Sequence, residues 1–89
     1  MSISNRKVVI VGAGHVGSHV GYALISQSLA DEIVYIDSDH AKAVAQALDL
    51  TDATNYLPVR TKVIAGDYSD AKDAQIMIIS AGPLPTGNQ

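Results

Sequence analysis

The feature that most constrains the fold is an apolar run that stops at closely spaced glycines. Residues 7–11, KVVIV, are apolar almost throughout, which is typical of a strand buried on both faces. The next segment, GAGHVG, leads into a stretch whose apolar residues recur with the helical period. A strand, a glycine turn and a helix begin a β-α-β unit, and they favour an α/β fold built on a parallel sheet with right-handed crossovers.

Four apolar runs are predicted to be strands, and two longer periodic stretches are predicted to be helices. The strands are expected at residues 7–11, 32–36, 61–65 and 75–80. The helices are expected from residue 15 to about residue 28, and from a cap at Ser38 or Asp39 to about residue 52. The segment GDYSDAKDA, residues 66–74, has room for at most a turn or two of helix, and residues 81–89 are predicted to form a loop.

This succession of elements predicts the strand order 3-2-1-4, with both helices on one face of the sheet. The last connection then crosses the sheet, and its nine residues reach about 30 Å when extended, so the crossing is taut. The carboxyl ends of the first and fourth strands meet, and Gly12 is expected to face Ala81 and Gly82 across a crevice. The second face of the sheet has no helix to cover it. We therefore expect residues 1–89 to be the N-terminal part of a longer domain.

Composition excludes several classes of function. The formal charge is −3 and there is no basic run, so nothing favours nucleic acid or an anionic membrane as a partner. The chain has no cysteine, which excludes disulfides and thiolate chemistry. No stretch approaches the roughly 18 apolar residues that span a bilayer, and the first residues lack the apolar segment of a signal peptide. These observations predict a cytoplasmic protein.

Residues 12–17 fit the pattern G-x-G-x-x-G, which binds a dinucleotide when it follows a strand and opens a helix. Gly12 permits a sharp turn, Gly14 omits a Cβ that would collide with a pyrophosphate, and Gly17 lets the helix approach the sheet. The pyrophosphate is expected on the first N–H groups of the helix. Gly17 and Gly21 each weaken the helix by about 1 kcal/mol relative to Ala, as expected where it lies close to a strand or a ligand. The alternative is a tight turn that binds nothing.

Asp37 ends the second predicted strand, twenty residues beyond Gly17. A carboxylate there accepts hydrogen bonds from both hydroxyls of an adenosine ribose, and it repels a 2′-phosphate. No arginine follows within the next few residues to reverse this preference, so NAD is favoured over NADP as the cofactor. The alternative is a solvated carboxylate at the end of a strand.

Lys42 and Tyr68 are weaker candidates for the same site. Lys42 lies one turn into the second predicted helix and would approach the adenosine end of a dinucleotide, although it is more simply a solvated residue. Tyr68 lies in the taut crossover near the expected adenine side of the crevice, or it covers an edge of the core. His15 and His19 are four residues apart, but no third ligand accompanies them, so we predict no metal site.

Three long stretches carry a resemblance to a known family. They are VVIVGAGHVGSHVGYAL, VYIDSDHAKAVAQALDLTDAT and GDYSDAKDAQIMIISAG, and they cover nearly the whole chain. In the same order, they resemble the N-terminal cofactor domain of NAD-dependent L-lactate dehydrogenases, of other L-2-hydroxy-acid dehydrogenases and, more distantly, of malate dehydrogenases. The specific parts are D-L-x-D-A at residues 49–53 and Y-S-D-x-K-D-A at residues 68–74. The resemblance implies a Rossmann-type doubly wound sheet, of which this chain holds the first four strands.

The resemblance also implies roles for individual residues. It assigns the pyrophosphate to Gly12, Gly14, Val16 and Gly17, the ribose to Asp37 with Lys42 and Tyr68 nearby, and backbone contacts along the cofactor to Ala81, Gly82 and Pro83. It implies that the intact protein is a homo-oligomer, a tetramer or a dimer, and transfers hydride between nicotinamide C4 and C2 of a 2-oxo acid. The family's catalytic arginines and its histidine–aspartate pair would lie beyond Gln89, so we name no catalytic residue in this chain.

The last residues depart from the usual lactate pattern, in which a glutamine and a Pro-Gly pair follow the dipeptide A-G. Here Pro83, Leu84 and Pro85 follow it. The resemblance makes Leu84 or Pro85 the position that meets the substrate side chain. An apolar residue there indicates an apolar, larger pocket, as in the 2-hydroxyisocaproate dehydrogenases, and the lack of an arginine disfavours malate. Two further alternatives are a non-catalytic NAD-binding module and a different Rossmann enzyme.

Overall fold

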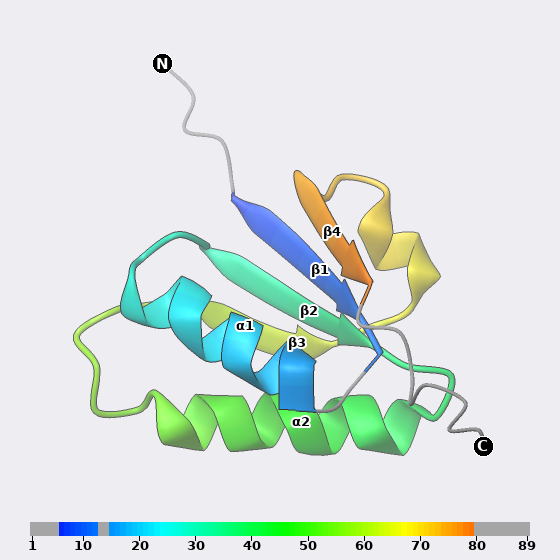
Figure 1. Cartoon of the computed structure of the whole chain (residues 1–89). Coiled ribbons are helices and arrows are strands. Elements are labelled where there is room, and N and C mark those ends of the chain that lie inside the picture. Colours follow the sequence, from blue (N-terminus) through cyan, green and yellow to red (C-terminus); the bar gives the residue numbers. More distant parts are fainter. Residues whose placement is uncertain (1–5, 13–14, 80–89) are drawn as a thin grey trace, which may run out of the picture.

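The computed structural model describes residues 6–12 and 15–79, and of residues 15 and 16 it describes the backbone alone. Within these residues, four parallel strands form one sheet in the order β3-β2-β1-β4 (Figure 1). The strands are β1 (Lys7–Val11), β2 (Glu32–Ile36), β3 (Lys62–Ala65) and β4 (Ile76–Ile79). The predicted strand order and parallel arrangement are confirmed. Within the described part, β3 begins one residue later than expected, and β4 also begins one residue later.

The described helices are α1 (His15–Ser26), α2 (His40–Ala53) and the short 3-10 helix η1 (Tyr68–Ala71). Of the two residues predicted to cap α2, Asp39 is the cap, and its carboxylate accepts a hydrogen bond from the N–H of Ala41 at 3.1 Å. Helix α1 ends earlier than predicted because Ser28 has a φ of 55°. That left-handed backbone cannot continue a helix.

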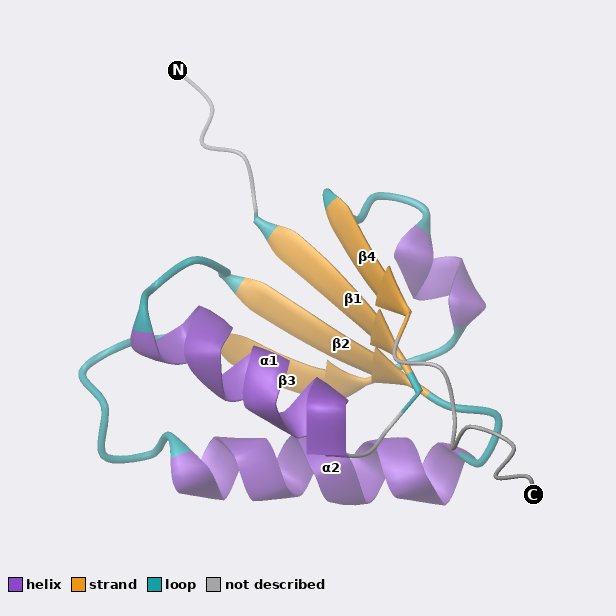
Figure 2. Ribbon diagram, viewed as in Figure 1, coloured by secondary structure: helices purple, strands orange, loops and turns teal. Residues whose placement is uncertain are grey.

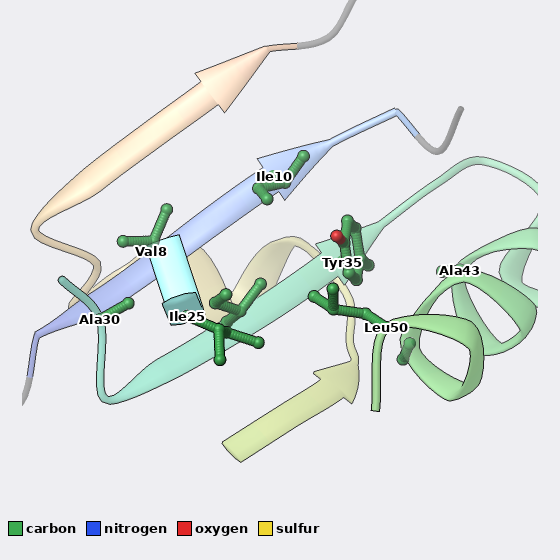
Figure 3. Packing of buried hydrophobic residues seen from close by; sticks show 9 residues of the cluster. Val8, Ile10, Ile25, Ala30, Tyr35, Ala43 and Leu50 are labelled. Carbon is green, nitrogen blue, oxygen red and sulfur yellow. The ribbon is translucent and has the colours of Figure 1, made fainter. Parts of the chain in front are cut away.

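The larger core lies between the sheet and the two α-helices, which cover the same face as predicted (Figures 1 and 2). Successive strand residues point to opposite faces of a sheet, so alternate residues of β1 and β2 meet the helices. Figure 3 shows this cluster, whose buried members are Val8, Ile10, Ile25, Ala30, Ile33, Tyr35, Ala43, Ala47 and Leu50.

The second face of the sheet is covered at its centre by the crossover between β3 and β4. Val9 and Val34 are fully buried there, with Ala71 and Ala74 of the crossover packed against their cluster. The expectation that this face stays open is therefore wrong over β1 and β2. Small alanines allow the crossover to lie close to the strands although it has only one short helix. At the edge strand β4, Ile79 remains 70% exposed.

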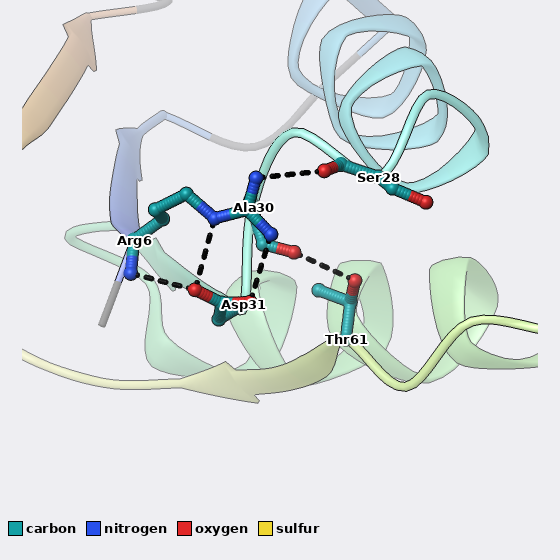
Figure 4. A network of polar contacts seen from close by, with 5 residues as sticks. All are labelled: Arg6, Ser28, Ala30, Asp31 and Thr61. Atoms are coloured by element: carbon teal, nitrogen blue, oxygen red, sulfur yellow. Dashed lines mark hydrogen bonds and ion pairs between the residues drawn. The ribbon is translucent and has the colours of Figure 1, made fainter. Parts of the chain in front are cut away.

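A polar network holds the amino-terminal ends of the strands together (Figure 4). The Arg6 guanidinium donates two hydrogen bonds of 3.0 Å to the Asp31 carboxylate and one of 2.9 Å to the carbonyl of Ser28. The Thr61 hydroxyl donates to the carbonyl of Ala30 at 2.8 Å. These bonds join the start of β1 to the loop between α1 and β2 and to the residue before β3. They lie at the sheet edge opposite Gly12, which follows the carboxyl end of β1.

Neither of the two α-helices that the structure describes has the length and hydrophobicity needed to cross a membrane.

Candidate cofactor-binding site

The chain turns sharply at Gly12, directly after β1. Gly12 has a φ of 95°, a conformation that glycine adopts without the steric penalty of a Cβ. Its N–H donates to the carbonyl of Ile36 at 2.7 Å, so it extends the pairing of β1 with β2 by one residue. The sharp turn predicted at this glycine is present.

Gly17 lies in the first turn of α1 and faces the glycine turn. A Cβ at this position would lie 3.2 Å from the carbonyl oxygen of Gly12 and 3.3 Å from Cγ2 of Ile10. Both distances are shorter than ordinary van der Waals contact, so a larger residue would push α1 away from β1. The close approach of helix and sheet that the sequence predicted at Gly17 is therefore observed.

Tyr35 also contacts the first turns of α1, and sequence analysis assigned it no role. Its ring is fully buried, and its hydroxyl donates to the carbonyl of Gly17 at 3.0 Å. Burial raises the pKa of the Tyr35 hydroxyl to about 12, so it remains a protonated donor at neutral pH. A Cβ at Gly21 would collide with this hydroxyl and would lie 2.7 Å from Cδ2 of Leu50. The helix-weakening glycine at position 21 was the signal in the sequence that something bulky lies beneath α1.

Asp37 follows β2 at the same edge of the sheet as Gly12. Its Oδ1 accepts a hydrogen bond from the N–H of Asp39 at 2.8 Å. This local turn holds the Asp37 carboxylate at the carboxyl end of β2 and leads into the cap of α2. The glycine turn and Asp37 are brought together because Gly12 bonds to Ile36, the residue immediately before Asp37.

The crossover begins at this edge too. The N–H of Gly66 donates to the carbonyl of Tyr35 at 2.9 Å, and η1 then starts at Tyr68, which is 64% exposed. Asp67 caps η1, and its pKa is lowered, mainly by hydrogen bonds from Ser69 and to a smaller extent by the charge of His40. Tyr68 thus lies shortly after the carboxyl end of β3, and its place beside the adenine stays a prediction.

The remaining predicted site residues divide into two groups. Lys42 is exposed in the first turn of α2, and Val16 lies in the first turn of α1, where only its backbone is described. Gly14, Ala81, Gly82 and Pro83 lie outside the described residues. The predicted crevice lies beyond the carboxyl ends of β1 and β4. The last residues of these two strands, Val11 and Ile79, pair in register.

Two other features of the described residues bear on the kind of site. Among the side chains that the structure describes, those of residues 6–12 and 17–79, no three of His, Asp or Glu form a group that could hold a metal ion. A separate surface pocket lies between α1 and α2 and is lined by Ser18, His19, Tyr22, Asp49, Leu50 and Ala53. It shares no residue with the edge formed by Gly12, Gly17 and Asp37, so it is not part of the candidate cofactor site.

Comparison with known proteins gives the family. Residues 6–86 match the family model described as "lactate/malate dehydrogenase, NAD binding domain". L-lactate dehydrogenase 3 of Bacillus cereus is 44% identical over 89 residues, which are 100% of this chain and 28% of the relative. L-lactate dehydrogenase 2 of Enterococcus faecalis is 42% identical over 82 residues, which are 92% of this chain and 26% of the relative.

Solved structures agree with this assignment. The minor L-lactate dehydrogenase from Enterococcus mundtii superposes with a TM-score of 0.86 at 41% identity, over 96% of this chain and 27% of that protein. A malate dehydrogenase from Cryptosporidium parvum superposes with a TM-score of 0.81 at 26% identity, over 90% of this chain and 26% of that protein. The chain thus spans between 26% and 28% of the length of these relatives. With the glycine turn and the order of its strands, these matches show that the chain belongs to the lactate/malate dehydrogenase family, that it carries sequence of that family's NAD-binding domain, and that its cofactor is NAD.

Proposed function

We propose that this chain is the NAD-binding portion of an L-lactate dehydrogenase-like L-2-hydroxy-acid dehydrogenase, which interconverts a 2-oxo acid and an L-2-hydroxy acid. Its relatives with 42–44% identity are named L-lactate dehydrogenases, and this supports the substrate class. The intact protein would be a cytoplasmic homo-oligomer. When bound, NAD supplies the hydride acceptor and NADH the donor, and the residues of this chain bind and orient the cofactor.

The proposal assigns the pyrophosphate to the N-terminus of α1. The first N–H groups of a helix have no acceptor within the helix, and the helix dipole favours an anion there. Helix α1 has no acidic residue in its first turn, so no carboxylate of its own occupies or repels the anion. Helix α2 differs, because its Asp39 carboxylate already accepts a hydrogen bond from the first turn. This contrast between α1 and α2 is the observation that carries the proposal.

The proposal assigns the adenosine ribose to Asp37. The Asp39 N–H bond to Oδ1 of Asp37 fixes the direction of the carboxylate at the same edge as the glycine turn. A fixed carboxylate binds a ribose diol more tightly than a mobile one, since less freedom is lost on binding. It also repels the 2′-phosphate of NADP. Tyr68 would border the adenine, and Lys42 would lie on the solvent side of the adenosine.

Titration of NADH and NADPH into the intact protein tests this proposal. We expect NADH to bind and NADPH to bind poorly. Asp37→Ala should weaken NADH binding at least about tenfold, because hydrogen bonds to a charged group are lost. It should also reduce the ratio of the affinity for NADH to the affinity for NADPH. The control is Asp52→Ala, an exposed carboxylate on α2. Equal affinity of the unmodified protein for both cofactors would overturn the ribose assignment.

The glycines give a second test. Gly14→Val should abolish NADH binding by steric collision if the pyrophosphate lies on this turn. Unchanged affinity in that variant would mean that the phosphates bind elsewhere.

The substrate is open to a direct comparison. A larger apolar 2-oxo acid is favoured by Leu84 and Pro85, which lie outside the described residues. We expect the intact enzyme to reduce pyruvate and 4-methyl-2-oxopentanoate and to discriminate against oxaloacetate, as measured by kcat/KM for each acid with NADH. A preference for oxaloacetate would contradict the proposed substrate class. NADH binding without reduction of any of these acids would instead favour a non-catalytic NAD-binding module.

A further inference from the structure

The buried hydroxyl of Tyr35 contacts the helix to which the pyrophosphate is assigned. Tyr35 belongs to β2 and is fully buried within the core cluster shown in Figure 3. A buried hydroxyl requires a hydrogen-bond partner, because leaving it unpaired is costly. The partner is the carbonyl of Gly17, in the first turn of α1, at 3.0 Å. A side chain of the sheet therefore bonds directly to the backbone of the proposed phosphate-binding turn.

The helix makes room for this tyrosine by lacking two side chains. A Cβ at Gly21 would collide with the Tyr35 hydroxyl, and a Cβ at Gly17 would lie 3.6 Å from Cε1 of the ring. The two glycines are four residues apart and so occupy one face of α1. The ring of Tyr35 thus fills the space that helical side chains would normally take, and the first two turns of α1 rest on it.

This contact sets both the distance of the start of α1 from β2 and the orientation of its first turn. The ring limits how closely the helix can approach β2, and the hydroxyl bond opposes rotation of the first turn away from the sheet. Backbone N–H groups bind a phosphate well only when they are held close to the required geometry, to within about 0.5 Å. A residue that fixes the turn therefore changes phosphate affinity without touching the phosphate.

We propose that Tyr35 is a positioning residue for NAD, which holds the first turn of α1 in place for the pyrophosphate through its hydrogen bond to Gly17. The inference rests on the proposed function, since it assumes that the pyrophosphate binds at the N-terminus of α1. It assigns to Tyr35 no contact with the cofactor. Its effect should fall on the diphosphate and leave the adenosine unaffected, because the Tyr35 hydroxyl bonds to α1, whereas the Asp37 carboxylate accepts its bond from Asp39 and Tyr68 lies in η1.

The experiment compares Tyr35→Phe with the unmodified intact protein, using three ligands. Phenylalanine keeps the ring and removes only the hydroxyl. The dissociation constants of NADH, ADP and adenosine are measured, the last two by displacement of NADH, under conditions where urea unfolding shows each protein to be folded. We expect NADH and ADP to bind about three- to tenfold more weakly, the range that the loss of one net hydrogen bond corresponds to, and adenosine to bind unchanged.

The matched control is Tyr22→Phe. Tyr22 lies on α1 as well, but it is 37% exposed and its hydroxyl contacts that of Tyr56 instead of the backbone of the first turn. All three ligands should bind this variant as they bind the unmodified protein. A second variant, Gly21→Ala, leaves the Tyr35 hydroxyl in place and displaces the helix from the ring. It should show the same weaker binding of ADP and NADH, with adenosine binding unchanged.

The outcomes separate this inference from the proposed function. Tyr35 has no positioning role if Tyr35→Phe binds ADP normally, or if its affinities for ADP and adenosine fall by the same factor. In either case the inference is wrong, while the assignment of NAD to this edge stands. If the unmodified protein binds neither ADP nor NADH, the proposed function fails, and this inference fails with it.

Discussion

The ammonium group of Lys7, at the start of β1, lies 2.8 Å from the carboxylate of Asp73 in the crossover. The two residues are 66 positions apart in the sequence. The Lys7 side chain is 9% exposed, whereas that of Asp73 is 78% exposed. The hydrogen bond between them raises the pKa of Lys7 and lowers the pKa of Asp73. The ion pair therefore fastens the crossover to the sheet and neutralises an otherwise enclosed charge.

Removing the Asp73 charge alone should destabilise the fold more than removing both charges of this pair. Asp73→Asn leaves the Lys7 ammonium enclosed without a countercharge, whereas Lys7→Met keeps the apolar stem and removes the charge. We expect Asp73→Asn to lower the midpoint of urea unfolding, and Lys7→Met to restore much of that loss in the double variant. Asp52→Asn, on the exposed surface of α2, is the control. Strictly additive effects of the two substitutions would show that the pair is not coupled.

The bond between Arg6 and Asp31 should make stability depend on pH in the acid range. Hydrogen bonds from Arg6 lower the pKa of Asp31 from 3.8 to about 2. Between these two values the unfolded chain binds more protons than the folded chain, so the free energy of unfolding falls as the pH drops from about 4 to about 2. Above pH 4 the contribution is fully present.

Urea unfolding measured at a series of acid pH values checks this expectation. Asp31→Asn should flatten the pH dependence in this interval, while Asp52→Asn should retain it. The effect should be small, because both side chains are partly exposed to solvent, Arg6 by 47% and Asp31 by 39%. An identical acid slope in the Asp31→Asn protein would rule out this ion pair as its origin.

The fit of Gly21 against Tyr35 predicts a non-additive pair of substitutions. Gly21→Ala gains about 1 kcal/mol of helix propensity, but its Cβ collides with the Tyr35 hydroxyl, and such overpacking typically costs about 1–3 kcal/mol. We expect the single variant to be destabilised. In the Tyr35→Phe background the oxygen is absent, so Gly21→Ala should cost less or become stabilising. A double-mutant cycle by urea unfolding measures the difference, and a coupling energy near zero would contradict the close contact between Gly21 and the Tyr35 hydroxyl.

The cap of α2 predicts a contrast between two neighbouring residues. Asp39→Ala removes the side chain that accepts from Ala41 and should lower the free energy of unfolding by about 1 kcal/mol. Ser38→Ala should have little effect, although serine is an equally good cap by residue type. Thermal or urea unfolding of both variants distinguishes them. A larger loss for Ser38→Ala would mean that α2 begins one residue earlier.

Much of the fold could be predicted because its signals are local. The strands β1 and β2 have the predicted bounds, since Gly12 and Asp37 mark where the two apolar runs end. The order of the strands followed from the alternation of strands and helices. The burial of the second face could not be predicted, because it depends on Ala71 and Ala74 in a segment without helical or strand periodicity.

One part of the candidate site could likewise be predicted from the sequence, and another could not. A parallel sheet brings the ends of β1 and β2 to one edge, so the proximity of Gly12 and Asp37 could be inferred from their positions after the strands. The role of Tyr35 could not be inferred, since its partner Gly17 is 18 residues away and the match between them appears only when α1 is packed on β2. Neither the bulky strand residue nor the helical glycine predicts this contact by itself.

The position of β4 beside β1 has a consequence for biosynthesis. The first strand to leave the ribosome receives its second neighbour only when residues 76–79 have been synthesised, and at about 5–20 residues per second this takes several seconds. Until then, one edge of β1 presents unpaired N–H and C=O groups to any other chain nearby. A nascent chain stalled before Ile76 should therefore bind holding chaperones at this bare edge and release them once β4 is in place.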